Sequence, residues 1–108
     1  MEDGLKCFLT DGSYFLGRME ITDSEIIIYK KNWWICVLLG TVGYAISTGK
    51  EYERFNISDI SDAARESFRL NRNAYHVTLK HDRGEFMFIF DHPRLTIGYL
   101  DAMILEAQ

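Results

Sequence analysis

Short stretches in which apolar and polar residues alternate run from residue 5 to residue 91, and no proline interrupts them. A period of two places successive side chains on opposite faces of a β-strand. The stretch at residues 14–21 lies between two polar turns, Asp11-Gly12-Ser13 and Thr22-Asp23-Ser24. Tight turns of this kind connect antiparallel strands. The sequence therefore predicts a sheet built largely from consecutive antiparallel hairpins.

The alternation, the β-branched residues and the turns together locate the strands. We expect strands at residues 5–10, 14–21, 25–30, 51–57, 74–81 and 85–91, weaker strand character at 59–61, and turns at 70–73 and 81–84. In the last strand Phe86, Phe88 and Phe90 share one face, while Met87 and Ile89 make the other face apolar too. A strand that is apolar on both faces is buried on both or contacts a partner.

The hydrophobic period changes after Asp91-His92-Pro93, which predicts a helix start with a cap residue followed by proline in the first turn. At about 100° per residue, one stripe of this helix gathers Ile97, Leu100, Met103, Ile104 and Ala107. The predicted fold class is therefore mainly β with a C-terminal α-helix, in which about seven antiparallel strands are capped by one helix.

Length and composition favour a single domain spanning residues 1–108, because a hydrophobic fraction of 47% is ample for one packed core. The net charge of −4 argues against a nucleic-acid partner, which is held by clustered lysine and arginine. Cys7 and Cys36 both lie among apolar residues and are expected to be reduced core thiols. The first residues lack the basic and apolar regions of a signal peptide, so we expect a cytoplasmic protein.

The most unusual feature is an apolar insert at residues 33–49, since no charged residue occurs between Lys31 and Lys50. The insert is too short and too rich in glycine to be a transmembrane helix, which needs about 20 apolar residues. Three interpretations stay open: an element of the domain's own core, a surface for self-association or a protein partner, and shallow insertion into a membrane. The residues expected to contact a partner or a membrane are Trp33, Trp34, Ile35, Val37, Leu38, Leu39, Val42 and Tyr44.

The sequence offers no arrangement typical of catalysis, so we expect a protein that is not an enzyme and has no catalytic, cofactor-binding or metal site. His76 and His81 are five residues apart in one expected strand and would point to opposite faces. His92 adjoins the predicted helix start, where a structural role is expected. Cys7 lies in a strand without a neighbouring histidine in the sequence to activate it.

Three stretches resemble the pleckstrin-homology-like (PH-like) superfold, in particular the bacterial relatives of its GRAM branch. Residues 17–29 are similar to the family's strand-turn-strand, residues 55–60 to its Ile-x-x-x-Asp-Ile strand, and residues 88–94 to its last strand running into the helix. The resemblance implies a PH-like β-sandwich or partly open barrel. It also implies a binding role, because such bacterial relatives carry a glycine-rich apolar stretch between the same strands.

Three functions follow as alternatives. The first is a non-catalytic module that binds a protein partner or forms a homo-oligomer through residues 33–46. The second is a cytoplasmic module that associates with the membrane surface through Trp33, Trp34 and the flanking lysines. The third is a small acidic inhibitor of a larger protein.

Phosphoinositide-binding members of the family carry a basic cluster across the first two strands. Here the corresponding segment offers only Lys6 and Arg18, with Asp11 between them. Since a phosphate cradle needs several converging cations, we predict no specific binding of phosphoinositides. Isothermal titration with soluble inositol phosphates should detect no binding. Micromolar affinity in that titration would contradict the prediction.

Overall fold

The computed structural model describes residues 1–31 and 50–107. These residues form seven β-strands, two short 3-10 helices and one α-helix. The strands are β1 (Glu2–Phe8), β2 (Tyr14–Ile21), β3 (Glu25–Lys30), β4 (Lys50–Asn56), β5 (Ile60–Phe68), β6 (Asn71–Leu79) and β7 (Glu85–Phe90). The helices are η1 (Ile57–Asp59), η2 (Lys80–Asp82) and α2 (Pro93–Ala107).

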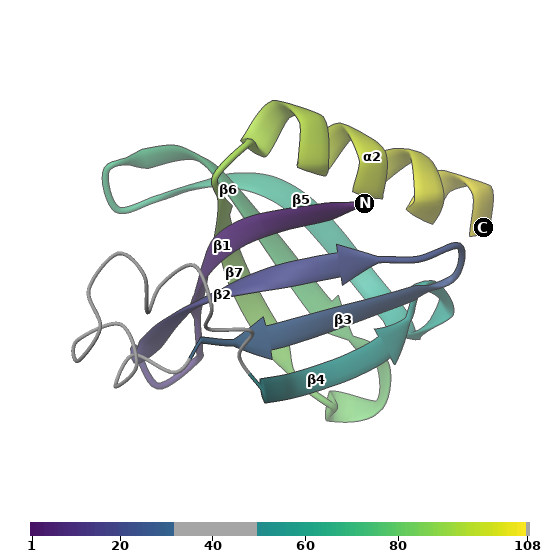
Figure 1. Ribbon diagram of the computed structural model, residues 1–108, viewed down its shortest axis with the longest axis horizontal. Coiled ribbons are helices and arrows are strands. Elements are labelled where there is room, and N and C mark those ends of the chain that lie inside the picture. Colours follow the sequence, from purple (N-terminus) through teal and green to yellow (C-terminus); the bar gives the residue numbers. More distant parts are fainter. Residues whose placement is uncertain (32–49, 108) are drawn as a thin grey trace.

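All seven strands belong to one antiparallel sheet in the order β4-β3-β2-β1-β7-β6-β5. The sheet curls into a half-barrel, and α2 lies across its open upper side (Figure 1). Each neighbouring pair except β1 and β7 is consecutive in the described sequence, as expected for a chain of hairpins. The predicted fold class, mainly β with about seven antiparallel strands and a C-terminal helix, is confirmed.

The alternation seen in the sequence appears as alternating burial in the strands. In β2, Phe15, Gly17, Met19 and Ile21 are buried, while the residues between them are exposed or half-buried. Gly17 has a specific role, because a Cβ atom at this position would collide with the backbone carbonyl oxygen of Tyr29 on β3. The glycine therefore allows the close approach of these two strands.

The structure corrects two expectations about strands and one about a turn. The first strand begins at Glu2 rather than at residue 5, because Glu2 and the residues after it pair with the end of β2. The strand expected only at 59–61 is the nine-residue β5, which is an edge strand with mostly exposed side chains and therefore lacks the hydrophobic alternation. The turn expected at 70–73 lies at Arg69 and Leu70 instead.

The concave face of the sheet and the inner face of α2 enclose one hydrophobic core. Its buried members are Leu5, Cys7, Phe15, Met19, Ile21, Ile26, Ile28, Phe55, Ile57, Tyr75, Val77, Leu79, Phe86, Phe88, Phe90, Ile97 and Leu100. Met103 and Ile104, which the helical stripe also predicted, are partly buried against this cluster. Burial of these apolar surfaces is the main favourable contribution to folding.

A buried carboxylate on β1 fixes the start of α2. The Asp3 side chain is only 3% exposed and accepts hydrogen bonds from the backbone N–H of His92 (3.0 Å) and the hydroxyl of Thr96 (2.7 Å). The Nδ1 atom of His92 lies 2.9 Å from the other carboxylate oxygen. The sequence predicted a cap residue within Asp91-His92-Pro93, whereas the structure shows that Asp3, on a distant strand, accepts hydrogen bonds from the start of the helix. Further along α2, the Tyr75 hydroxyl donates to Asp101 (2.7 Å).

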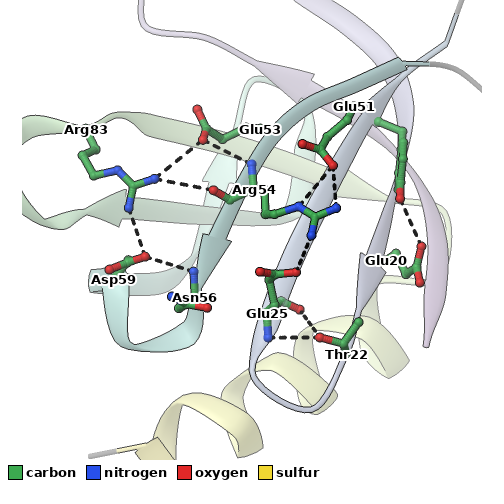
Figure 2. Close-up of polar contacts among 10 residues, drawn as sticks. Glu20, Thr22, Glu25, Glu51, Glu53, Arg54, Asn56, Asp59 and Arg83 are labelled. Atoms are coloured by element: carbon green, nitrogen blue, oxygen red, sulfur yellow. Dashed lines mark hydrogen bonds and ion pairs between the residues drawn. The ribbon is translucent and has the colours of Figure 1, made fainter.

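A second set of polar contacts joins the turn before β7 to the edge strand β4. The guanidinium of Arg83 lies 3.0 Å from Asp59 and 3.8 Å from Glu53, and it donates to the backbone carbonyl oxygen of Arg54 (3.5 Å; Figure 2). Beneath it, the rings of Phe55 and Phe86 are stacked with centroids 6.3 Å apart. These contacts join β4 to the turn before β7 and to the β7 residue Phe86, although β4 and β7 are not neighbours in the sheet.

Substituting Leu100→Ala should lower the free energy of unfolding by about 2–5 kcal/mol, because Leu100 is buried between α2 and the sheet. Leu105→Ala is the matched control, since Leu105 lies on the same helix but is 73% exposed. Chemical denaturation would measure both. An unchanged midpoint for Leu100→Ala would contradict the assignment of this helix face to the core.

Candidate functional site

The residues predicted to contact a partner, Trp33 to Tyr44, lie outside the described residues. The positions at which the chain leaves and rejoins the sheet are described. Lys30 at the end of β3 pairs with Lys50 at the start of β4, and the backbone N–H of Lys31 donates to the carbonyl oxygen of Leu16 (2.9 Å). Lys31 and Lys50 therefore both lie at one end of the sheet, next to the start of β2.

Exposed apolar and cationic side chains surround this anchor point. Tyr14 and Leu16 on the outer face of β2 are 56% and 51% exposed. The Nζ atom of Lys6 lies 5.2 Å from the centre of the Tyr14 ring, and that of Lys30 lies 5.7 Å from the centre of the Phe15 ring. We call Lys6, Tyr14, Leu16 and Lys30 the insert-end surface. It combines apolar contact area with positive charge, in a chain whose net charge is negative.

The inner side of the same end is aromatic. The rings of Phe15 and Tyr52 lie 4.7 Å apart, and Tyr52 is 40% exposed. Cys7, on the neighbouring strand, is fully buried and free, as the sequence predicted. Burial raises the pKa of its thiol to about 12, so the reactive thiolate does not form near neutral pH. Cys36 lies outside the described residues.

A pocket opens on the convex face of the sheet, between β1, β7 and the hairpin of β5 and β6. We call it the outer pocket; its volume is about 320 Å³. It is lined by Phe8, Leu9, Thr10, Phe68, His76, Glu85, Phe86 and Met87. The rings of Phe8 and Phe68 lie 4.8 Å apart, and the guanidinium of Arg69 stacks over both of them. The pocket is thus apolar at its base, with charged groups at its rim.

His76 forms the polar wall of the outer pocket. Its Nδ1 atom lies 3.2 Å from a Glu66 carboxylate oxygen, and its Nε2 atom bonds Glu85. Burial lowers the pKa of His76, but the hydrogen bonds and charges of the two glutamates outweigh that effect, so the pKa is raised above its ordinary value. The imidazolium therefore balances part of the negative charge at the rim.

The histidines are not brought together. His76 lies on the convex face, His81 lies in the exposed turn between β6 and β7, and His92 contacts Asp3 at the start of α2. Across residues 1–31 and 50–107, no group of three histidine, cysteine or acidic side chains has the geometry to hold a metal ion.

Sequence reasoning missed the insert-end surface and the outer pocket. The alternation in β2 did carry a signal, because Tyr14 and Leu16 occupy positions of the outward-facing set that Arg18 and Glu20 continue. The apolar outer positions of β7 were recognised, and Met87 does line the pocket. The sequence did not indicate that Phe68 lines the pocket, because its position depends on how far the hairpin of β5 and β6 curls toward β1.

Substituting Glu85→Gln should lower the pKa of His76, because the substitution removes one negative partner while burial continues to disfavour the imidazolium. In the native protein the raised pKa stabilises the fold below the ordinary histidine value of about 6.5, and this contribution is lost as the pH rises through the higher folded-state value. An NMR titration of the His76 ring measures the shift, and Glu106→Gln on α2 is the control. A pKa that does not fall in Glu85→Gln would contradict this electrostatic account.

No helix in the described part of the chain is long and apolar enough to span a membrane. No protein-family model matches the sequence, and no curated protein matches it either.

Solved structures do match. The C-terminal domain of an unknown protein from Leishmania infantum aligns with a TM-score of 0.64 and 13% identity, over 97% of this chain and 82% of that one. Vav1, in a structure described as inhibited by an allosteric inhibitor, aligns with a TM-score of 0.66 and 12% identity. That match covers 96% of this chain and 26% of the Vav1 chain. At these identities the likeness shows the fold alone, and the Vav1 match fits a PH-like fold for this chain.

Proposed function

We propose that this protein is a non-catalytic binding module that contacts a protein partner or a second copy of itself through residues 33–46 and the adjoining insert-end surface. The observation that carries the proposal is the exposure of Tyr14 and Leu16 beside the anchor point of the insert. Lys31 and Lys50, from which the uncharged segment leaves and rejoins the sheet, thus lie at the end of the sheet where apolar side chains of β2 face outward. Membership of the GRAM branch stays a prediction from the sequence.

The size of the core supports the proposal. The described strands and α2 already supply a continuous buried cluster, in which the rings of Phe55, Phe86 and Phe88 stack in one row. Residues 33–46 add two tryptophans and several aliphatic side chains to this total. Exposing such a surface costs roughly 25 cal/mol per Å², so a partner that covers it would stabilise the assembly. A symmetric dimer is the simplest cover, because one patch then meets its own copy.

A membrane surface is the second candidate, favoured by one specific observation. Lys6 lies over the exposed ring of Tyr14 at the insert-end surface, and Lys30 lies over Phe15 on the inner side of the same end. Aromatic and basic side chains side by side are typical of proteins that lie at the headgroup level of a bilayer. In this case the tryptophans of the insert would enter the interface, and the lysines would contact anionic lipid.

The test is the solution mass of the wild type and of the double variant Trp34→Lys, Leu38→Lys. We expect a wild-type mass above that of the monomer at high micromolar concentration, and a folded double variant of lower mass. Leu95→Lys with Leu105→Lys is the matched control, because it adds the same charge at exposed apolar positions on α2. Circular dichroism verifies that each variant is folded.

Two further measurements decide between the interpretations. A wild type that stays monomeric, with residues 33–46 protected from hydrogen exchange at high dilution, would make the insert ordinary core and overturn the proposal. Flotation with vesicles of phosphatidylcholine, with and without phosphatidylserine, tests the membrane alternative. Flotation that requires phosphatidylserine and is lost in the double variant would favour that alternative over a protein partner.

A further inference from the structure

The contact between β1 and the start of α2 has an ionisable group on each side. The Asp3 carboxylate on β1 is only 3% exposed, whereas the side chain of His92, one residue before α2, is 75% exposed. The carboxylate faces three donors, which are the backbone N–H and Nδ1 of His92 and the hydroxyl of Thr96. Of these donors, only the imidazole changes its charge near neutral pH. The contact therefore has two states, which differ by one proton on a ring that solvent reaches.

Two carboxylates favour the protonated ring. Asp3 lies 2.9 Å from Nδ1 of His92, and Asp91 precedes His92 in the chain. The hydrogen bond to Asp3 and the attraction of its charge, with a smaller contribution from Asp91, raise the pKa of His92 above its ordinary value. The imidazolium is therefore the form that the folded protein stabilises.

The other charged groups near the ring weaken this preference without reversing it. The cavity beside the contact, about 360 Å³ in volume, is also lined by Glu2, Arg18 and Lys31. Arg18 forms an ion pair with Glu2, so these two charges largely cancel. The N-terminus of a helix carries a partial positive charge, which disfavours a cation at His92. The direct contact with Asp3 outweighs these repulsions, since the net effect is a raised pKa of His92.

We propose that His92 is a pH-sensitive switch for the start of α2: the imidazolium holds the first turn of the helix against Asp3, and loss of its proton loosens that turn while the rest of the domain stays folded. The neutral ring can still donate a hydrogen bond through Nδ1, but it lacks the charge that strengthens such a bond. The later part of α2 is held separately, because Tyr75 donates to Asp101 and Leu100 is buried. The opening is therefore confined to the start of the helix.

Both ionisable groups set the direction of the pH dependence. Since the pKa of His92 is raised, its contribution is complete below the ordinary histidine value of about 6.5 and is lost as the pH rises through the folded-state value. Burial by itself would raise the pKa of Asp3, but the hydrogen bonds from His92 and Thr96 outweigh burial and lower it. The contribution of Asp3 is complete above its ordinary value of about 3.9 and is lost as the pH falls through the lower folded-state value. The contact is thus tightest between about pH 4 and 6.5, and it loosens on the alkaline side.

Amide hydrogen exchange of the full chain, followed by NMR between pH 6 and pH 8.5, tests this switch. The informative amides are those of His92, which bonds Asp3, and of Thr96, which bonds the carbonyl oxygen of His92. After correction for the intrinsic effect of pH on exchange, we expect their protection to fall by roughly two- to fivefold over this range, as for the loss of one exposed ion pair. The amides of β3 are the reference and should keep their protection.

Three variants identify the group responsible. His92→Gln removes the titrating ring but keeps a side-chain donor, so the pH dependence should disappear. His81→Gln is the matched control, because His81 lies in the exposed turn between β6 and β7, and it should keep the wild-type dependence. Asp3→Asn should bring the pKa of His92, measured from the ring protons, towards its ordinary value. Because Asp3→Asn also weakens a buried contact, the His92→Gln result decides the matter by itself.

Two results would overturn the proposal. The first is a wild type in which protection at the start of α2 stays constant between pH 6 and pH 8.5. The second is a fall in protection that persists in His92→Gln, which would assign the effect to His76, a second histidine with a raised pKa. The experiment does not involve residues 33–46, so this proposal and the proposed function can fail independently.

Discussion

A curled sheet that does not close must have its concave face covered, and the whole fold depends on how α2 meets this requirement. The sheet offers rows of phenylalanine and isoleucine, and α2 contributes Ile97 and Leu100 to the same core. The helix is placed by Asp3, whose buried carboxylate accepts hydrogen bonds from the start of α2. A buried charge is costly unless it is well bonded, so this anchor specifies one position for the helix.

Because the concave face is committed to the core, the proposed binding would have to use the convex face and the hairpin ends. Three exposed apolar side chains stand out there. Tyr14 and Leu16 lie at the start of β2, and Leu70 lies at the tip of the hairpin of β5 and β6. Figure 1 shows this hairpin and the start of β2 on the same side of the molecule. None of the three belongs to the core. Of these, Tyr14 and Leu16 lie beside the ends of the uncharged segment, which is why the proposed function includes them.

The sequence predicted β2, β3 and the start of α2 well, because alternation, polar turns and a single proline are local signals. It predicted only the start of β5, at residues 59–61, since an edge strand with Arg65, Glu66 and Ser67 exposed has little hydrophobic pattern. For the site, the uncharged run at 33–46 was evident from the sequence, and the exposed neighbours Tyr14 and Leu16 were not singled out. Whether an apolar residue on an outer face is covered depends on which strands curl over it.

The sequence by itself therefore determined the hairpins, the helix stripe and the fold class, because each depends on the spacing of residues within one element. The tertiary structure decided which distant groups meet. Asp3 bonds His92, 89 residues away, and Arg83 reaches across to β4. The outer pocket exists because Phe8 and Phe68 come together from β1 and β5. Such encounters follow from the curvature of the whole sheet, which no local pattern of residues specifies.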